Sequence, residues 1–170
     1  ATDTVRVTVN DPQVDAGNDA AFCAGGSAQL LATGTGNISW QPTSGLSATD
    51  IADPIATPSS TTTYTVSLTD PANCAATDSV TVTVNAVPTA SAGQDLTPCA
   101  NTTITLGGAP TGPSGSTFAW SPATGLNDIA IANPTLTVTA DVEYVVTVTD
   151  ANSCANTDTM QVTVLPLPDV

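Results

Sequence analysis

The stretch that decides the fold is residues 62–85, which read Thr-Thr-Tyr-Thr-Val-Ser-Leu-Thr-Asp-Pro-Ala-Asn-Cys-Ala-Ala-Thr-Asp-Ser-Val-Thr-Val-Thr-Val-Asn. Apolar residues occupy alternate positions on either side of a polar turn, namely Tyr64, Val66 and Leu68 before Asp70-Pro71-Ala72-Asn73 and Val80, Val82 and Val84 after it. A period of two predicts strands with one buried face, and the short turn between them predicts an antiparallel hairpin.

This hairpin occurs twice, because the chain is an internal repeat. The recurring residues are Cys23 and Cys99, Trp40 and Trp120, Tyr64 and Tyr144, Asp70 and Asp150, Cys74 and Cys154, and Thr77-Asp78 and Thr157-Asp158. A third, partial copy runs from Thr2 to Asn10 and matches Thr77–Asn85. We therefore expect residues 1–10 to be the last strand of a preceding, truncated repeat. Repeat 1 should span residues 11–85, repeat 2 residues 86–165, and the linker to a following repeat residues 166–170.

Strand signals upstream of each hairpin complete the fold prediction. In repeat 1 they lie near residues 12–16, 27–33, 37–41 and 52–57, which makes about seven strands per repeat. We expect an all-β chain of tandem immunoglobulin-like β-sandwiches of about seven strands each. Tyr64 occupies the position at which that fold often has its tyrosine corner.

The composition excludes most chemistry. The 170 residues include 15 acids, 1 base and no histidine, for a formal net charge of −14. Such a chain has no lysine nucleophile and no imidazole base, so we expect no enzyme, no cofactor and no metal centre. Nucleic acid and anionic membrane surfaces would repel it. No apolar run approaches the roughly 18 residues of a membrane span, so no membrane insertion is expected in this segment.

Several motifs together point to a family. Ala-Gly-x-Asp, Trp-x-Pro-x-x-Gly-Leu, Thr-Asp-x-x-x-Cys and Thr-Asp-Ser-Val-Thr-Val-Thr-Val resemble the tandem Ig-like and PKD-like repeats of very large Bacteroidota surface proteins. Those proteins include gliding-motility adhesins and cargo of the phylum's own secretion system. The resemblance covers residues 2–165, although Val142-Glu143-Tyr144 replaces Thr62-Thr63-Tyr64 and neither copy has the glycine that many relatives place before the second cysteine.

The resemblance implies an extracellular, cell-surface location. We expect a structural repeat segment of a surface filament or stalk, which gives length and projects or constitutes an adhesin. The alternative is a carbohydrate-binding or spacer region of a large secreted polysaccharide hydrolase. The expected partners are neighbouring repeats of the same chain, while lateral homo-assembly into a fibre and binding to surface glycans stay open.

Two sets of side chains could form a site, and each also has a structural explanation. Trp40 and Trp120 could stack on sugars, but a single Trp on the third strand of such a sandwich usually belongs to the core. The acids could bind Ca²⁺ at module junctions or could keep the array soluble, the residues in repeat 1 being Asp11, Asp15, Asp19, Asp70 and Asp78. Asp141 and Glu143 would share one strand face, but no nucleophile accompanies them.

Four cysteines in a secreted chain predict disulfides. The default is one bridge inside each repeat, Cys23–Cys74 and Cys99–Cys154. In an immunoglobulin-like sandwich, however, the two cysteines of one repeat would lie at opposite poles, beyond the roughly 7 Å Cα limit of a disulfide. A bridge between Cys23 and Cys154 would then staple neighbouring repeats, with Cys74 and Cys99 reaching repeats outside this chain. Both arrangements stay open.

A covalent modification is also predicted. Asp3-Thr4-Val5, Asp78-Ser79-Val80 and Asp158-Thr159-Met160 each place a hydroxyl residue between Asp and an apolar residue. This order is similar to the O-glycosylation signal that Bacteroidota use on exported proteins, which makes Thr4, Ser79 and Thr159 candidate sites. The alternative is that Thr-Asp-Ser or Thr-Asp-Thr merely forms the turn into the last strand and recurs because the module was duplicated.

Overall fold

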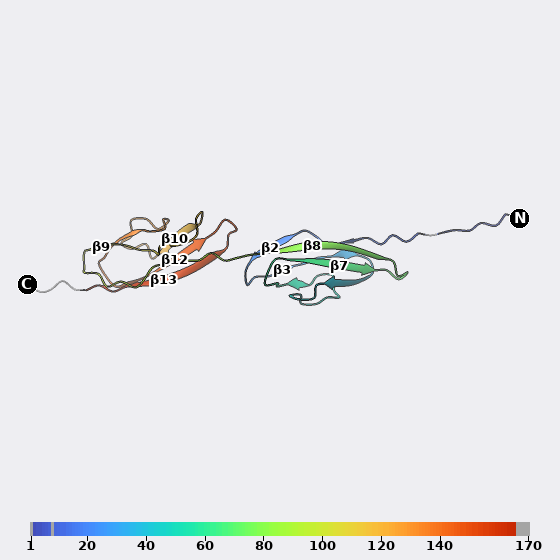
Figure 1. The fold of residues 1–170 in the computed structure, drawn as a ribbon, viewed down its shortest axis with the longest axis horizontal. Coiled ribbons are helices and arrows are strands. Elements are labelled where there is room, and N and C mark those ends of the chain that lie inside the picture. The colour runs from blue at the N-terminus through green and yellow to red at the C-terminus, as the bar shows by residue number, and fades with distance from the viewer. Residues whose placement is uncertain (1, 8, 166–170) are drawn as a thin grey trace, which may run out of the picture. The chain divides into compact units, whose positions relative to one another are not determined.

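The computed structural model describes residues 2–7 and 9–165, and the chain divides into two compact units, Ala1–Asn85 (unit 1) and Ala86–Val170 (unit 2). Within the described residues all regular structure is β-strand, as Figure 1 shows. None of those residues forms a helix long and apolar enough to cross a membrane. The all-β prediction is therefore confirmed.

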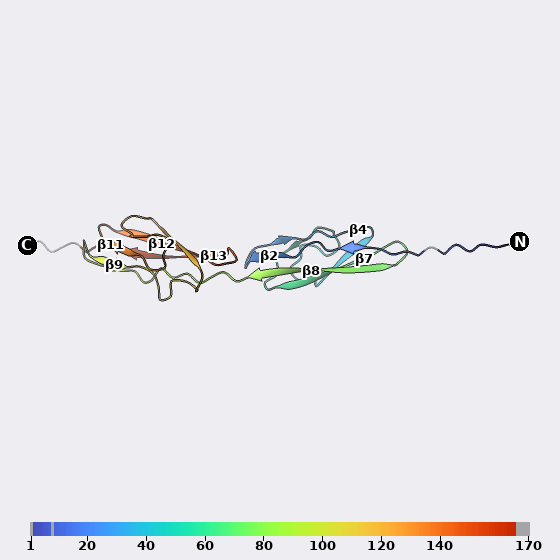
Figure 2. The ribbon, with the colours of Figure 1, turned by 90° about the horizontal axis from the view of Figure 1, so that it is seen from above.

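Unit 1 is built around the predicted hairpin. Its strands are β1 (Val14–Asp15), β2 (Ala20–Cys23), β3 (Ala28–Gln29), β4 (Thr33–Gly34), β5 (Asn37–Gln41), β6 (Ile55–Ala56), β7 (Thr62–Thr69) and β8 (Ala75–Asn85). The main sheet has the order β2-β8-β7-β5, while β3 pairs with β6 and β1 pairs with β4. Strands β7 and β8 are antiparallel, with Tyr64 opposite Val80, and they appear as the long neighbouring arrows of Figures 1 and 2.

Unit 2 repeats this plan. Its strands are β9 (Thr103–Thr105), β10 (Thr117–Ser121), β11 (Thr135–Thr137), β12 (Val142–Thr149) and β13 (Ala155–Val162). The main sheet has the order β10-β12-β13, and β9 pairs with β11. The segment equivalent to β2 makes two isolated parallel bridges, Leu96 with Val162 and Cys99 with Leu165.

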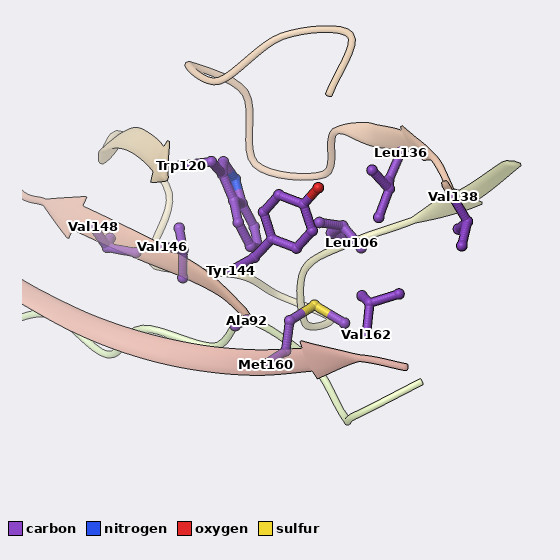
Figure 3. Packing of buried hydrophobic residues seen from close by; sticks show 10 residues of the cluster. All are labelled: Ala92, Leu106, Trp120, Leu136, Val138, Tyr144, Val146, Val148, Met160 and Val162. Carbon is purple, nitrogen blue, oxygen red and sulfur yellow. The ribbon is translucent and has the colours of Figure 1, made fainter. Parts of the chain in front are cut away.

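Each unit has its own core between the two layers of strands. The period-two pattern is reflected directly in burial, because Tyr64, Val66 and Leu68 on β7 are fully buried while their neighbours along the strand are not. Figure 3 shows the corresponding cluster of unit 2, in which Trp120 and Tyr144 lie among aliphatic side chains. Because the core contains few aromatic residues, valine, leucine and alanine fill most of it.

Two details differ from the sequence prediction. The strand β2 was not expected, and the strands expected at 27–33 and 52–57 shorten to β3 and β6. The backbone between the latter two segments is still paired, since the amide of Leu30 donates to the carbonyl of Pro54 at 3.0 Å and that of Ala32 to Ala52 at 2.8 Å. The expected strands therefore continue as irregular hydrogen-bonded chain.

The described residues of the N-terminal segment lie outside the β-sheets. Residues 2–7 and 9–13 form no strand, and Val5, Val7 and Val9 are 86%, 81% and 83% exposed. Their equivalents Val80 and Val82 are 1% and 0% exposed. The predicted linker 166–170, together with residues 1 and 8, lies outside the described residues.

Candidate functional site

The two tryptophans are core residues. Trp40 on β5 is fully buried and Trp120 on β10 is 3% exposed. Each indole N–H donates a hydrogen bond to a backbone carbonyl, Trp40 to Ile51 and Trp120 to Ile131, both at 3.0 Å. A buried ring with a satisfied N–H cannot stack on a sugar without unfolding its surroundings. The prediction that these residues are core is confirmed, and the sugar-platform interpretation is wrong.

Shallow hollows on unit 1 do not restore a sugar site. One is lined by Asn10, Asp11, Pro12, Gln13, Gly34, Thr35 and Asp70, and another by Gly36, Asn37, Ile38, Asp50 and Ala52. Neither lining includes an aromatic side chain on which a pyranose ring could stack. The residues at these hollows therefore give the carbohydrate-binding alternative no support.

A tyrosine corner is present in both units. The hydroxyl of Tyr64 donates to the carbonyl of Ser44 at 2.9 Å, and that of Tyr144 donates to the carbonyl of Thr124. Burial raises the pKa of both phenols above the ordinary value of 10.0. The corner ties the main sheet to the loop after the tryptophan strand, so its role is structural.

The aspartates act as acceptors for backbone amides. Asp78 accepts from the amide of Ala16 at 2.8 Å, and Asp19 accepts from the amide of Thr81 at 2.7 Å. Hydrogen bonds from the amides of Ala16 and then Ser79 hold the pKa of Asp78 below its ordinary value. Together the two carboxylates fasten the first segment of unit 1 to its last strand.

The same pair of aspartate–amide hydrogen bonds occurs in unit 2. Asp158 accepts from the amide of Ala92, and Asp95 accepts from the amide of Gln161, both at 2.8 Å. The repeated Ala-Gly-x-Asp and Thr-Asp motifs are thus two halves of one structural device. The pairing was not predicted from the sequence, although the recurrence of both motifs in each copy was the signal that could have revealed it.

The turn acids hold the hairpins. Asp70 Oδ1 accepts from the amides of Ala72 and Cys74 at 2.9 Å, and Asp150 does the same for Asn152 and Cys154. Asp141, which shares a strand face with Glu143 in the sequence prediction, accepts from the amide of Val164 at 2.7 Å. Across the described part of the chain, no group of three or more His, Cys, Asp or Glu side chains could hold a metal ion.

The four cysteines fall into two classes. Cys23 and Cys154 are disulfide-bonded, while Cys74 and Cys99 are free thiols. The default bridges Cys23–Cys74 and Cys99–Cys154 are therefore wrong, because each would join a bonded cysteine to a free one. The physical reason is distance: Cys23 is level with Asn85 at the end of β8, whereas Cys74 directly precedes its start. Eleven residue steps along the strand separate those points by about 36 Å.

The candidate glycosylation residues lie where an enzyme could reach them. Ser79 on β8 and Thr159 on β13 are exposed, opposite Thr65 and Val145 of the neighbouring strands. Thr4 is exposed in the extended N-terminal segment. All three side chains point away from the cores.

Comparisons with known proteins identify the fold. No family model and no curated protein matches the sequence. Among solved structures, extracellular domains 3–5 of Drosophila OTK align with a TM-score of 0.52 and 11% identity, over 90% of this chain and 62% of that one. The titin I-band fragment I67–I69 aligns with a TM-score of 0.48 and 13% identity, over 94% of this chain and 67% of that one. The chain is a tandem of immunoglobulin-like β-sandwiches.

Proposed function

We propose that this chain is a non-catalytic structural segment of an extracellular surface filament or stalk, of the kind found in large Bacteroidota surface proteins. Its repeats give length and project or constitute an adhesin. The observation that carries the proposal is the position at which the chain enters and leaves each unit.

Each unit has a turn end, where its last hairpin turns, and an exit end, where its last strand finishes. In unit 1 the side chain of Asn10 donates to Asp70 at the turn end, and the chain leaves at Asn85 at the other end of β8. In unit 2 the side chain of Asn156, beside the turn, donates to the carbonyl of Pro88 at 3.0 Å. Because the chain enters at one end and leaves at the other, adding repeats adds length.

The redox state of the cysteines supports an extracellular location. Disulfides persist in oxidising compartments, and Cys23 and Cys154 are bonded. A net charge of −14 with a single base also favours solubility and disfavours binding to nucleic acid.

Small-angle scattering on chains of two, four and six repeats tests the filament proposal. The maximum dimension should rise by about 35–45 Å for each added repeat, since one repeat is about as long as its last strand plus a short linker. An increment of less than half that value would mean that the repeats fold back on one another, and would refute the proposal.

Residues 2–10 are, in this proposal, the last strand of a preceding repeat. They differ from residues 77–85 only at Thr4, which corresponds to Ser79, and at Arg6, which corresponds to Thr81. The exposed valines 5, 7 and 9 match strand positions whose side chains in unit 1 face the core or its edge. Supplying the preceding repeat upstream should protect the amides of Val5 and Val7 from hydrogen exchange, and unchanged exchange would refute this assignment.

O-glycosylation of Thr4, Ser79 and Thr159 is the second part of the proposal. Exposure of the three side chains supports it. The recurrence of the aspartate before each site does not support glycosylation, because the hydrogen bonds of Asp78 and Asp158 to backbone amides already explain it. Intact-mass spectrometry of protein from its native source should show added hexose masses, which Thr4→Ala, Ser79→Ala and Thr159→Ala each remove by one site. Unmodified peptides at all three positions would refute it.

A further inference from the structure

Every repeat carries one cysteine at each end. At the exit end, Cys23 is paired in the sheet with Asn85, the last residue of β8. Cys99 forms the equivalent backbone β-bridge with Leu165. At the turn end, Cys74 and Cys154 directly precede β8 and β13, and the amide of each is held by the turn aspartate at 2.9 Å. The two positions of one repeat are therefore a strand length apart.

The two bonded cysteines belong to different ends of different repeats. Cys23 lies at the exit end of unit 1 and Cys154 at the turn end of unit 2, and both are disulfide-bonded. Three residues, Ala86-Val87-Pro88, lead the chain from Asn85 to the carbonyl that Asn156 holds.

The two free thiols occupy the other turn-end and exit-end positions of the chain. Cys99 is the exit-end cysteine of unit 2 and Cys74 the turn-end cysteine of unit 1. Cys99 is exposed and Cys74 is partly buried. Their equivalents, Cys23 and Cys154, are disulfide-bonded, so both positions are able to form disulfides.

We propose that one inter-repeat disulfide, exit-end cysteine to turn-end cysteine, recurs along the array: Cys23 with Cys154 inside this chain, and Cys99 and Cys74 each with a further repeat. This rests on the proposed function, in which like repeats adjoin this chain. In a solution of the chain alone, the available partner is a second copy, so Cys99 of one copy bonds Cys74 of the next. Such a head-to-tail contact is heterologous, so it links successive copies into a ring or an open filament rather than a closed dimer.

The chemistry requires an oxidant, for which a small disulfide such as oxidised glutathione suffices. One protein thiolate attacks that disulfide, giving a mixed disulfide and releasing one small thiol. The second protein thiolate attacks the mixed disulfide and releases the other small thiol. Two protein thiols thereby lose two protons and two electrons, and one small disulfide is reduced to two thiols.

The chain suits peptide mapping with a protease that cleaves before aspartate. Each cysteine falls on its own fragment: residues 19–49, 70–77, 95–127 and 150–157. Fragment 19–49 should be linked to fragment 150–157 in the purified chain. In concentrated chain exposed to oxidised glutathione, oligomers should form in which fragment 95–127 is linked to 70–77 at about tenfold excess over either self-linked pair.

Two serine variants provide the matched control. Cys74→Ser alone and Cys99→Ser alone should stay monomeric, whereas their mixture should form a heterodimer and nothing larger. Undirected oxidation would instead give three linked pairs in a ratio of about 1:2:1. These are 70–77 linked to itself, 70–77 linked to 95–127, and 95–127 linked to itself. Each variant alone would then dimerise. That outcome, the absence of any 95–127/70–77 link, or a 19–49/70–77 link would overturn the proposal. If the thiols pair at random but the maximum dimension measured by scattering still rises with each repeat, only the disulfide proposal fails and the filament proposal stands.

Discussion

Removing the Tyr64 hydroxyl is the sharpest test of how each repeat holds together. The ring of Tyr64 is fully buried, and its hydroxyl donates to the carbonyl of Ser44 at 2.9 Å. Tyr64→Phe keeps the ring and deletes one hydrogen bond, leaving a carbonyl without its donor. Such a loss costs about 1–2 kcal/mol. For a unit of this size, each kcal/mol lowers Tm by about 4–8 °C.

Hydrogen exchange read by mass spectrometry can assign this loss to one unit. Tyr64→Phe should lower the free energy of opening for amides of β7 and β8 and leave those of β12 and β13 unchanged. The reciprocal variant Tyr144→Phe is the matched control, because the Tyr144 hydroxyl donates to Thr124 in the same corner of unit 2. A change below about 0.3 kcal/mol, or an equal loss of protection in both units, would refute the reasoning.

The same hydroxyls predict a response to alkali. Burial raises the pKa of Tyr64 and Tyr144 above 10.0, so the folded chain keeps protons that the unfolded chain releases. Stability is therefore fully present below pH 10 and is lost as the pH rises toward the folded pKa. The double variant Tyr64→Phe/Tyr144→Phe should show a flatter decline of Tm above pH 10, and an unchanged slope would contradict the assignment.

Four further outcomes follow from the structure. Asp78→Asn should make Tm fall less steeply with pH in acid. The lowered pKa of Asp78 stabilises the fold above pH 3.8, and that contribution is lost as the pH falls through the folded pKa. An unchanged dependence of Tm on pH in acid would contradict this. Ser153→Gly should raise stability by about 0.5–1 kcal/mol in urea titrations, because Ser153 has a φ of 63°; a loss would contradict it. Val80→Asp should unfold unit 1 by circular dichroism while Val5→Asp has no effect, since Val80 is 1% and Val5 is 86% exposed. Millimolar CaCl₂ should raise Tm no more than NaCl of equal ionic strength, and a larger rise would show a specific site.

The sequence predicted the parts of the fold that depend on local pattern. The hairpin of β7 and β8 was found because apolar and hydroxyl residues alternate without interruption on both sides of the turn. Strand β2 was missed because Ala20–Cys23 has no such alternation, and because it pairs in parallel with Val82–Asn85, about sixty residues away. A pairing that depends on distant chain leaves little trace in a short window of sequence.

The residue before the second cysteine of each repeat has an unusual backbone conformation. This residue is Asn73 in unit 1 and Ser153 in unit 2. Both residues adopt left-handed backbone conformations, with φ of 61° and 63°. Asparagine tolerates that region better than most residues, while serine does so at a cost. The turn geometry is therefore kept although its most suitable residue is absent.

The strong preference for aspartate over glutamate has a structural explanation. A net charge of −14 would oppose folding if the carboxylates served only as surface charges. Instead, Asp19, Asp78 and Asp70 each accept hydrogen bonds from backbone amides, and the equivalent residues of unit 2 do the same. The short side chain of aspartate reaches an amide of a neighbouring segment or of its own turn with little loss of rotamer freedom. Acids placed in this way fasten strand ends and turns while they keep the surface anionic, so one residue type contributes both to the cohesion of each repeat and to a charged surface that favours solubility.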